Sequence, residues 1–287
     1  LDNSPMRLTF LGTAAADAFP EAFCSCDNCA RARGLGGPSL RRRSAALIDD
    51  DLLIDLGPDI HTACHAFGLS LAQVRDCIQT HPHSDHLDAA HLLSRSAEYG
   101  TRGTPLMGFH ASAQTLQRLA WAVARDFEPG SILDPENAQR LNVRFNTVAP
   151  HTPFAAGRYR VTGFPANHDP AMGSLLYAVE ADGQALFYGT DTAALAEEVW
   201  QGFRRLGLTF DAVVLDHTYG PTQEGEGHLC AREVSEYVVR MRAEGLLRPG
   251  GRVFATHIAH EGNPPHPELS AWAAAHGYEA AYDGLVV

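Results

Sequence analysis

Short apolar runs bounded by polar and turn-forming residues recur along the whole chain and predict a protein rich in β-strands. The Asp182-Gly183 pair separates two such runs, residues 175–181 and 185–188, and this spacing is a strong hairpin signal. We expect a second, closing hairpin over Asp283-Gly284. The other predicted strands are residues 7–11, 45–48, 52–55, 77–80, 106–109, 143–146, 159–164, 213–215 and 253–256.

Helical periodicity occurs at residues 113–125, 193–206 and 231–244, the last with Val234, Val238 and Met241 on one face. Strands and hairpins with interspersed helices, but no strict alternation, predict an α/β fold of two mixed sheets packed face to face with helices outside. No repeat or linker divides the chain, so we expect residues 1–287 to form a single domain. Residues 1–5, before Met6, are expected to be disordered or an expression remnant.

Composition places the chain among ordinary globular proteins, since 45% of its residues are hydrophobic and 20% are charged. No apolar stretch reaches membrane-spanning length, and the start of the chain lacks the layout of a signal peptide. The net charge of −12, without a basic tail, argues against a broad nucleic-acid surface. Bound divalent ions would still make an active cleft locally positive.

The candidate chemistry begins at His81-Pro82-His83-Ser84-Asp85-His86, directly after an apolar run that predicts a buried strand. In extended backbone alternate side chains point the same way, so His81 and His83 can converge on one ion. Asp85 and His86 turn past the strand end and can face a second position a few ångströms away. Imidazole and carboxylate suit Zn, Mn or Fe, and neighbouring ions are the geometry of two-metal hydrolysis. A solvated histidine-rich loop is the alternative, but four ligands in this order favour a metal site.

Three more ligand candidates each follow a predicted strand. His168 comes after residues 159–164, Asp191 after residues 185–188, and His257 after residues 253–256. Taken singly, each is read more simply as a surface histidine or a helix-capping aspartate. Taken as a set that follows the first motif, they are better read as further metal ligands.

Three of the six cysteines crowd into Cys24-Ser25-Cys26-Asp27-Asn28-Cys29. Cysteines this close seldom form good disulfides with one another, whereas thiolates at this spacing commonly share a zinc ion. Six cysteines are also too few for a disulfide scaffold in 287 residues. This usage indicates a reducing compartment, and we expect a cytoplasmic protein. Three thiolates would need a fourth nitrogen or sulfur ligand to close a structural zinc site.

The histidine motif followed by His168, Asp191 and His257 resembles the metallo-β-lactamase superfamily of binuclear hydrolases. Within it, Cys24-x-Cys26-x-x-Cys29 after Leu11-Gly12-Thr13 resembles the PhnP branch of phosphoribosyl cyclic phosphate phosphodiesterases. The other matching motifs are Leu53-Ile54-Asp55-Leu56-Gly57, Asp191-Thr192-Ala193, Gly227-His228 and Thr256-His257-Ile258-Ala259-His260. The resemblance covers nearly the whole chain and implies a four-layer αββα sandwich, with the metals where strands of both sheets end.

The resemblance also implies roles for these residues. One divalent ion, Mn or Zn, would be held by His81, His83 and His168, the other by Asp85, His86 and His257, with Asp191 bridging them. A separate structural zinc would be held by Cys24, Cys26, Cys29 and His260. His228 would act in catalysis together with Asp85, as the general acid toward the leaving oxygen, because the ordinary pKa of a histidine is near neutrality. The alternative for His228 is a helix-end histidine without a catalytic role.

The activity implied is hydrolysis of a small cyclic phosphate or nucleotide-like phosphodiester by metal-hydroxide attack. We expect a small phosphate ester as partner, no membrane and no nucleic acid, and either a monomer or a homodimer. The alternatives are a PqqB-like oxidoreductase or cofactor-biosynthesis protein, an RNA-processing nuclease, and a lactonase or thioesterase. Residues 13–20 resemble the PqqB branch, but chains of that branch generally have an altered histidine motif. Residues 100–153 make this chain longer than a compact phosphodiesterase, so the substrate does not carry over securely.

Two patterns are expected to have no role in catalysis. His61, Cys64 and His65 share one helical face, but no fourth ligand accompanies them, and we read them as partly buried helix residues. Arg41-Arg42-Arg43 is either a solvated run or a phosphate contact, and we expect at least two of the three to be solvated.

Overall fold

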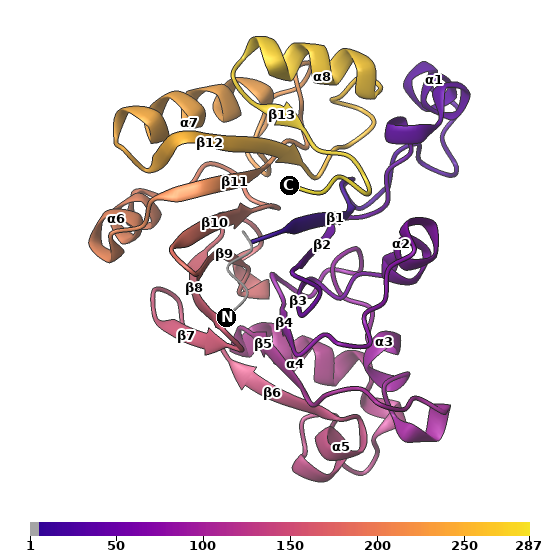
Figure 1. The fold of residues 1–287 in the computed structure, drawn as a ribbon. Helices are drawn as coiled ribbons and strands as arrows, with labels where there is room; N and C mark the ends of the chain where they lie inside the picture. Colours follow the sequence, from indigo (N-terminus) through magenta and orange to yellow (C-terminus); the bar gives the residue numbers. More distant parts are fainter. Residues whose placement is uncertain (1–5) are drawn as a thin grey trace.

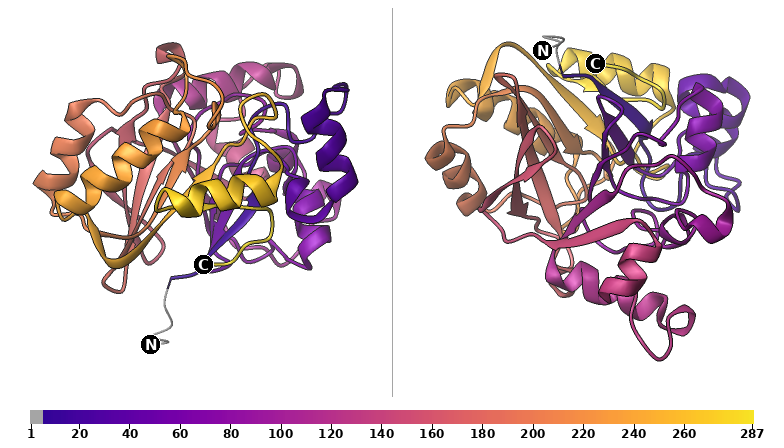
Figure 2. Two further views of the ribbon diagram at one scale, coloured as in Figure 1. Left: turned by 90° about the horizontal axis from the view of Figure 1, so that it is seen from above. Right: turned by 60° about the horizontal axis from the view of Figure 1, so that its bottom comes forward.

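The computed structural model describes residues 6–287, so the expectation for residues 1–5 lies outside the described part. Two sheets pack face to face, and helices lie on the outer face of each (Figure 1; Figure 2). The predicted four-layer αββα architecture is therefore confirmed. None of the described helices is long and apolar enough to span a membrane.

The first sheet has six strands whose spatial order follows the chain. Its first three strands are antiparallel and the remaining pairs are parallel. The strands are β1 (Leu8–Gly12), β2 (Ala45–Ile48), β3 (Leu52–Ile54), β4 (Asp76–Ile78), β5 (Met107–Ala111) and β6 (Val143–Thr147).

The second sheet has seven strands in the order β13-β12-β11-β10-β9-β8-β7. They are β7 (Pro153–Ala156), β8 (Tyr159–Pro165), β9 (Leu175–Ala181), β10 (Gln184–Gly189), β11 (Phe210–Asp216), β12 (Leu247–Thr256) and β13 (Glu279–Ala280). The hairpin predicted at Asp182-Gly183 is confirmed, since Gln184 lies opposite Ala181 in an antiparallel pair. The strands from β10 to β13 pair in parallel.

The helices flank the two sheets, and α1 (Asp27–Leu35) projects at one end of the molecule (Figure 1). On the six-stranded side lie α2 (Ile60–Phe67), α3 (Ala90–Leu93), α4 (Ala113–Ala122) and α5 (Pro135–Arg140). On the seven-stranded side lie α6 (Glu197–Leu206), α7 (Ala231–Ala243) and α8 (His266–Ala275). Short 3-10 turns occupy Gly37–Ser39, Ala97–Tyr99, Ala124–Asp126 and Pro170–Met172.

Three apolar cores alternate with the four layers. Strand β10 shows how one segment serves two of them, because successive side chains of a strand point to opposite faces. Leu186 and Tyr188 pack between the sheets, whereas Ala185 and Phe187 pack against the outer helices. Burying each large apolar side chain stabilises the fold by about 1.5–3 kcal/mol. Strands buried on both faces therefore appear in the sequence as continuous apolar runs.

The closing hairpin predicted over Asp283-Gly284 is wrong. Strand β13 pairs in parallel with β12, and after the turn the chain crosses to the other sheet, where Leu8 and Val287 exchange backbone hydrogen bonds. The Asp283 carboxylate accepts hydrogen bonds from the Thr13 hydroxyl and the Arg42 backbone N–H. These contacts hold the turn against the first sheet, so it connects two sheets instead of two neighbouring strands.

Other elements also differ from the prediction. The helix expected at residues 193–206 begins only at Glu197, because the backbone of Ala196 is extended, with φ −61° and ψ 149°. The helix expected at residues 113–125 ends at Ala122 and is followed by a 3-10 turn. Strand β7 was not predicted, since it is an edge strand that starts with proline. Residues 100–153 contain β5, β6, α4 and α5, so much of this region is regular secondary structure.

Candidate active site

The predicted ligands meet at one edge of the sandwich because each follows the carboxyl end of a strand. The histidine motif follows β4, His168 follows β8, and Asp191 and His257 follow β10 and β12. Asp55, Asp191 and His257 have φ values of 66°, 58° and 57°, in the left-handed region that side chains other than glycine rarely adopt. Such a conformation costs about 1–3 kcal/mol and is typical of functional sites, where it turns a side chain away from the strand direction.

The first group of candidate ligands consists of His81, His83, His168 and Asp191. His83 Nδ1 lies 2.9 Å from His81 Nε2 and 3.1 Å from His168 Nε2. Asp191 Oδ2 is 3.0 Å from His81 Nε2, and Asp191 Oδ1 is 3.4 Å from His168 Nδ1. The structure thus brings together the set that the sequence predicted for one ion.

The second group consists of Asp85, His86, Asp191 and His257, and all four are buried. His86 Nε2 is 3.2 Å from Asp85 Oδ2 and 3.3 Å from both Asp191 Oδ2 and His257 Nε2. Asp191 belongs to both groups, which is the position that a bridging carboxylate would need. Whether these residues bind ions remains a prediction.

The donor atoms fit a pair of divalent cations. Two nitrogen ligands of a tetrahedral zinc are separated by about 3.4 Å, and the histidine nitrogens here lie 2.9 to 3.3 Å apart. Asp191 Oδ1 is buried and accepts no hydrogen bond from any described residue. A buried carboxylate oxygen without a donor is costly, so this atom is suited to a cation. The nitrogen and carboxylate donors also match borderline metals such as Zn and Mn.

Burial and charge keep most of these groups in the protonation state that metal binding requires. Burial lowers the pKa of His81 to about 4 and also lowers that of His168. Burial alone would raise the pKa of Asp85 and Asp191, but the surrounding histidines hold both well below the usual range. Burial alone would lower the pKa of His86, but the charges of Asp85 and Asp55 hold it well above the ordinary value. A metal cation bound at His86 Nε2 would take the place of the proton there and compensate the charges of the neighbouring carboxylates Asp85 and Asp191.

Asp55 contacts the candidate ligand His86 on the side away from the metal position, a role that the sequence analysis did not assign. Its Oδ2 lies 2.7 Å from His86 Nδ1, and its Oδ1 accepts hydrogen bonds from the Thr80 backbone N–H and the Gln79 side chain. An acceptor at Nδ1 favours the tautomer of His86 whose Nε2 lone pair faces the candidate metal position. The motif Leu53-Ile54-Asp55-Leu56-Gly57 was the available signal, because it places a carboxylate at a strand end.

Asp216 and Thr218 were also missed, although Asp216 ends β11 as the other ligands end their strands. The Thr218 hydroxyl is 2.7 Å from His257 Nδ1 and donates to Asp216 Oδ1 at 2.9 Å. Asp216 Oδ2 lies 3.1 Å from His228 Nδ1. One buried carboxylate therefore orients a candidate ligand and the candidate general acid together.

His228 lies in an exposed loop before α7 and reaches the edge of the site, with Nδ1 3.3 Å from Asp191 Oδ1. Its ring packs edge-on against Tyr219 at a centroid separation of 5.6 Å. A Cβ on Gly225 would lie 2.6 Å from the Tyr219 ring, so the loop can close over this ring only with glycine there. Burial acts to lower the pKa of His228, but its hydrogen bond to Asp216 and the neighbouring carboxylate charges raise it to about 9.

The cysteine cluster forms a separate group of Cys24, Cys26, Cys29 and His260, as predicted. His260 Nδ1 lies 3.6 Å from Cys26 Sγ and 3.9 Å from Cys24 Sγ, near the separation of about 3.5 Å between S and N ligands of a tetrahedral zinc. Cys26 is the N-cap of α1, and the hydrogen bond from the Cys29 backbone N–H lowers the pKa of its thiol to about 6. This arrangement favours a thiolate at the cluster.

Comparison with known families agrees with this geometry. The family model described as the β-lactamase superfamily domain matches residues 51–258, which include the histidine motif, His168, Asp191 and His257. The chain belongs to the metallo-β-lactamase superfamily. This match confirms the predicted superfamily and fold. Members of this superfamily are generally metal-dependent hydrolases. No curated protein sequence matches the chain.

Several solved structures share this superfamily fold along nearly their whole length. A diphosphatase from the PhnP family has 19% identity and a TM-score of 0.74, covering 98% of this chain and 96% of that one. Zn²⁺-bound PqqB from Methylobacterium extorquens has 20% identity and a TM-score of 0.69, covering 98% and 99%. Human tRNase Z, short form, has 16% identity and a TM-score of 0.63, covering 98% of each chain. At these identities the likeness shows the fold and not the substrate.

The remaining sequence candidates lie apart from the superfamily site. His61 and His65 are exposed on α2, contrary to the partly buried positions expected, and only Cys64 is half-buried. Arg41 is buried and donates to the Thr13 hydroxyl and the Ala281 carbonyl, whereas Arg42 and Arg43 are half-buried, so the run is less solvated than expected. Arginine can be buried here because two fixed acceptors replace water.

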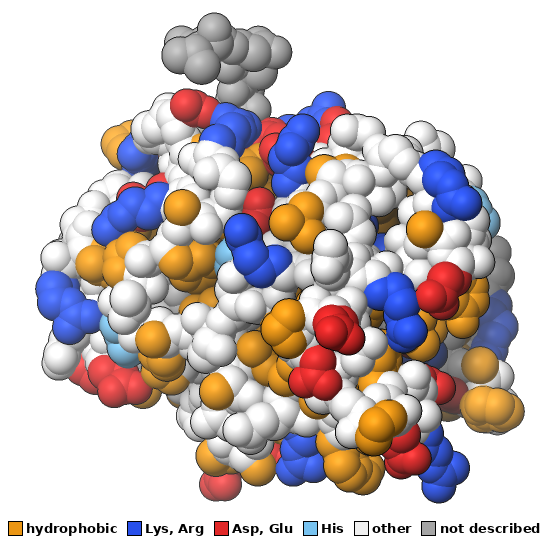
Figure 3. Space-filling model, turned by 90° about the horizontal axis from the view of Figure 1, so that it is seen from below, with side chains coloured by type: hydrophobic (Ala, Val, Ile, Leu, Met, Phe, Trp, Pro, Cys, Tyr) orange, Lys and Arg blue, Asp and Glu red, His pale blue; other side chains and the backbone are white. Residues whose placement is uncertain are grey.

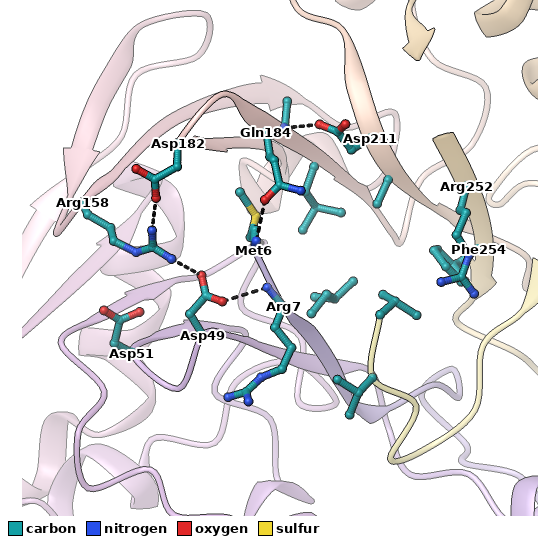
Figure 4. A pocket seen from close by; sticks show the side chains of 16 residues that line it. Met6, Arg7, Asp49, Asp51, Arg158, Asp182, Gln184, Asp211, Arg252 and Phe254 are labelled. Carbon is teal, nitrogen blue, oxygen red and sulfur yellow. Dashed lines mark hydrogen bonds and ion pairs between the residues drawn. The ribbon is translucent and has the colours of Figure 1, made fainter. Parts of the chain in front are cut away.

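A cavity of about 930 Å³ lies at the opposite edge of the sandwich, where strands begin (Figure 4). Its floor is apolar and includes Phe254, and Arg158 on its rim pairs with both Asp49 and Asp182. The cavity contains none of the candidate metal ligands, so it is separate from the candidate active site.

Proposed function

We propose that the protein is a binuclear metal-dependent phosphodiesterase that acts on a small cyclic phosphate or nucleotide-like ester. One observation carries this proposal: the two groups of ligands predicted for the two ions share Asp191, and His228 lies 3.3 Å from the same carboxylate, in a third group with Asp216 and His257. The shared aspartate supports two adjacent cations, and the adjoining histidine supports a proton donor beside them. This combination suits the displacement of an alkoxide from phosphorus.

In this proposal His81, His83 and His168 would hold one ion, Asp85, His86 and His257 would hold the other, and Asp191 would be shared by both. When bound, the two ions supply an activated water nucleophile and offset charge on the phosphoryl oxygens. Asp85 stays ionised, because the neighbouring histidines hold its pKa well below the usual range, so in this proposal it would hold a cation and orient the attacking water as a hydrogen-bond acceptor.

His228 would donate the proton that the leaving oxygen requires. Its Nδ1 is engaged by Asp216, which leaves Nε2 as the nitrogen that can face substrate. The pKa of about 9 keeps the ring protonated at neutral pH, which is the form that a general acid needs. The half-buried position of His228, with 21% of its side chain exposed, allows contact with a substrate that enters from solvent.

The cysteine cluster supports the choice of the PhnP branch, and we propose that Cys24, Cys26, Cys29 and His260 bind one structural zinc. The superfamily fold is shared with a diphosphatase of the PhnP family, which is consistent with phosphate chemistry. On the face seen in Figure 3, basic and acidic side chains are interspersed. That distribution and the net charge of −12 favour a small substrate over RNA.

A substrate screen tests the proposal against its alternatives. The purified protein, loaded with Mn²⁺ or Zn²⁺, would be assayed with bis-aryl phosphates, cyclic nucleotides, a diphosphate, lactones and thioesters, and for oxygen consumption. We expect metal-dependent hydrolysis of a phosphodiester that is lost in Asp191→Asn. Hydrolysis of lactones or thioesters alone would contradict phosphate chemistry. Metal-dependent oxygen uptake without hydrolysis would favour the PqqB-like oxidoreductase instead.

A further inference from the structure

His260 uses its two ring nitrogens in opposite directions. Nδ1 faces the thiols, 3.6 Å from Cys26 Sγ, while Nε2 lies 3.1 Å from Asp17 Oδ2. A neutral imidazole has one N–H and one lone pair. Because a carboxylate only accepts, the N–H belongs at Nε2 and the lone pair is left at Nδ1. We infer that Asp17 is a positioning residue that holds His260 in the orientation and tautomer needed to bind zinc with the three cysteines.

The backbone holds Asp17 in the same frame as His260. The Ala15 N–H donates to the Ile258 carbonyl, and the Ile258 N–H donates to the Thr13 carbonyl, so the turn that carries Asp17 is hydrogen-bonded to the segment after β12. Within the turn, the Ala18 N–H donates to the Ala15 carbonyl. The carboxylate and the imidazole are therefore placed by one hydrogen-bonded unit and not by two independent loops.

Other contacts fix the main chain of His260 but not its ring. The Asn28 side chain donates to the His260 carbonyl at 3.0 Å, which ties the start of α1 to this segment. The centroid of the Phe19 ring lies 6.5 Å from that of the imidazole, on one side of His260. Among these contacts, the 3.1 Å approach of the Asp17 carboxylate to Nε2 is the one that distinguishes the two ring nitrogens. Asp17 itself does not join the cluster of candidate ligands, since it lies beyond the far side of the ring.

Limited exposure makes this contact more than a solvated ion pair. The side chain of His260 is 11% exposed and that of Asp17 is 30% exposed. A metal-bound histidine commonly donates its other N–H to a carboxylate, and loss of that partner typically weakens metal binding by roughly 10- to 100-fold. An exposed ion pair with no such role would leave zinc binding unchanged on removal of Asp17.

The inference rests on the structural zinc proposed above, and zinc retention is its direct test. Asp17→Ala, the nearly isosteric Asp17→Asn and the wild-type protein would be stripped of active-site ions by brief EDTA treatment, and zinc release to a chromogenic chelator would then be followed. Asp27→Asn is the matched control, because Asp27 is an exposed acidic residue that begins α1 and lies beside Cys26. Circular dichroism would confirm that each variant is folded.

We expect Asp17→Ala to weaken zinc binding by roughly 10- to 100-fold, with a smaller loss in Asp17→Asn because its amide oxygen still accepts, and no change in Asp27→Asn. In the Co²⁺-substituted protein, the absorption bands of a Cys₃His site should change in Asp17→Ala. Zinc binding and Co²⁺ spectra equal to wild type in Asp17→Ala, in a protein whose Cys26→Ser variant loses one zinc, would overturn the role of Asp17 alone. Unchanged zinc content in Cys26→Ser would overturn the zinc site itself, and the inference with it.

Discussion

His228 Nδ1 lies 3.1 Å from Oδ2 of Asp216, a fully buried carboxylate at the end of β11. The two residues are 12 positions apart; Asp216 ends a strand, and His228 follows a glycine-containing loop. The same carboxylate accepts a hydrogen bond from the Thr218 hydroxyl, which also contacts His257 Nδ1. The candidate general acid and one candidate metal ligand therefore depend on a single buried charge.

Replacing that charge should change the pH dependence of the reaction. Burial opposes protonation of His228, and Asp216 overcomes this to raise its pKa to about 9, so the acid form is lost as pH rises through that value. Asp216→Asn removes the charge and should lower the pKa, which moves the alkaline fall in kcat to lower pH. We expect kcat for an alkyl phosphodiester near pH 8 to fall by roughly 10- to 100-fold, which is less than the rate enhancement of roughly 10²–10⁴ that a positioned proton donor usually provides.

Metal analysis is the control for Asp216→Asn, because Thr218 connects Asp216 to His257. Retention of both active-site ions together with the shifted pH profile would assign the effect to His228. An unchanged pH profile with normal metal content would show that Asp216 does not set the protonation of His228.

Removal of His228 should depend on the leaving group. His228→Ala is expected to keep its metals and fold while kcat falls by roughly 10²–10⁴ for an alkyl ester. The loss should be much smaller for p-nitrophenyl esters, because p-nitrophenolate departs with little need of a proton. His65→Ala, which removes an exposed histidine on α2, is the matched control. Equal losses for both leaving groups would indicate substrate positioning instead of proton donation.

Asp191→Asn should reduce the number of bound ions. Two neighbouring divalent cations repel each other, and a carboxylate between them offsets that repulsion, whereas a neutral amide does not. We expect the stoichiometry of active-site metal measured by elemental analysis to fall from two ions toward one, with loss of activity. Asp126→Asn, at an exposed position far along the chain, should leave both unchanged. Normal metal content in Asp191→Asn would mean that Asp191 only supports the backbone turn after β10.

The two kinds of site should differ in lability. Cys24, Cys26, Cys29 and His260 would enclose their zinc with soft ligands, whereas the other ions must keep open positions for substrate. Brief EDTA treatment should therefore remove activity and leave about one zinc per chain. Loss of every ion at the same rate would argue against separate sites. Cys26→Ser should lower the melting temperature more than it changes kcat in the metal-loaded protein, because structural zinc contributes to folding free energy.

Local spacing in the sequence was sufficient to predict several of these features. The alternation of side chains in extended backbone placed His81 and His83 on one side, and the turn residues after each apolar run marked where His168, Asp191 and His257 leave their strands. The Asp182-Gly183 hairpin was equally local, and the structure contains it. Each of these features depends on residues a few positions apart, whose relative directions the backbone geometry determines.

The partners of these residues depend on contacts between distant segments. Asp55 meets His86 across 31 positions, and Asp17 meets His260 only because the turn after β1 bonds to the segment after β12. Arg41 is buried for the same reason, and Asp283-Gly284 joins two sheets instead of closing a hairpin. The sequence by itself determined which side chains can face a common edge, since that follows from local backbone periodicity. Only the tertiary structure decided which acceptor each histidine has, because that depends on sheet order and on the packing of segments far apart in the chain.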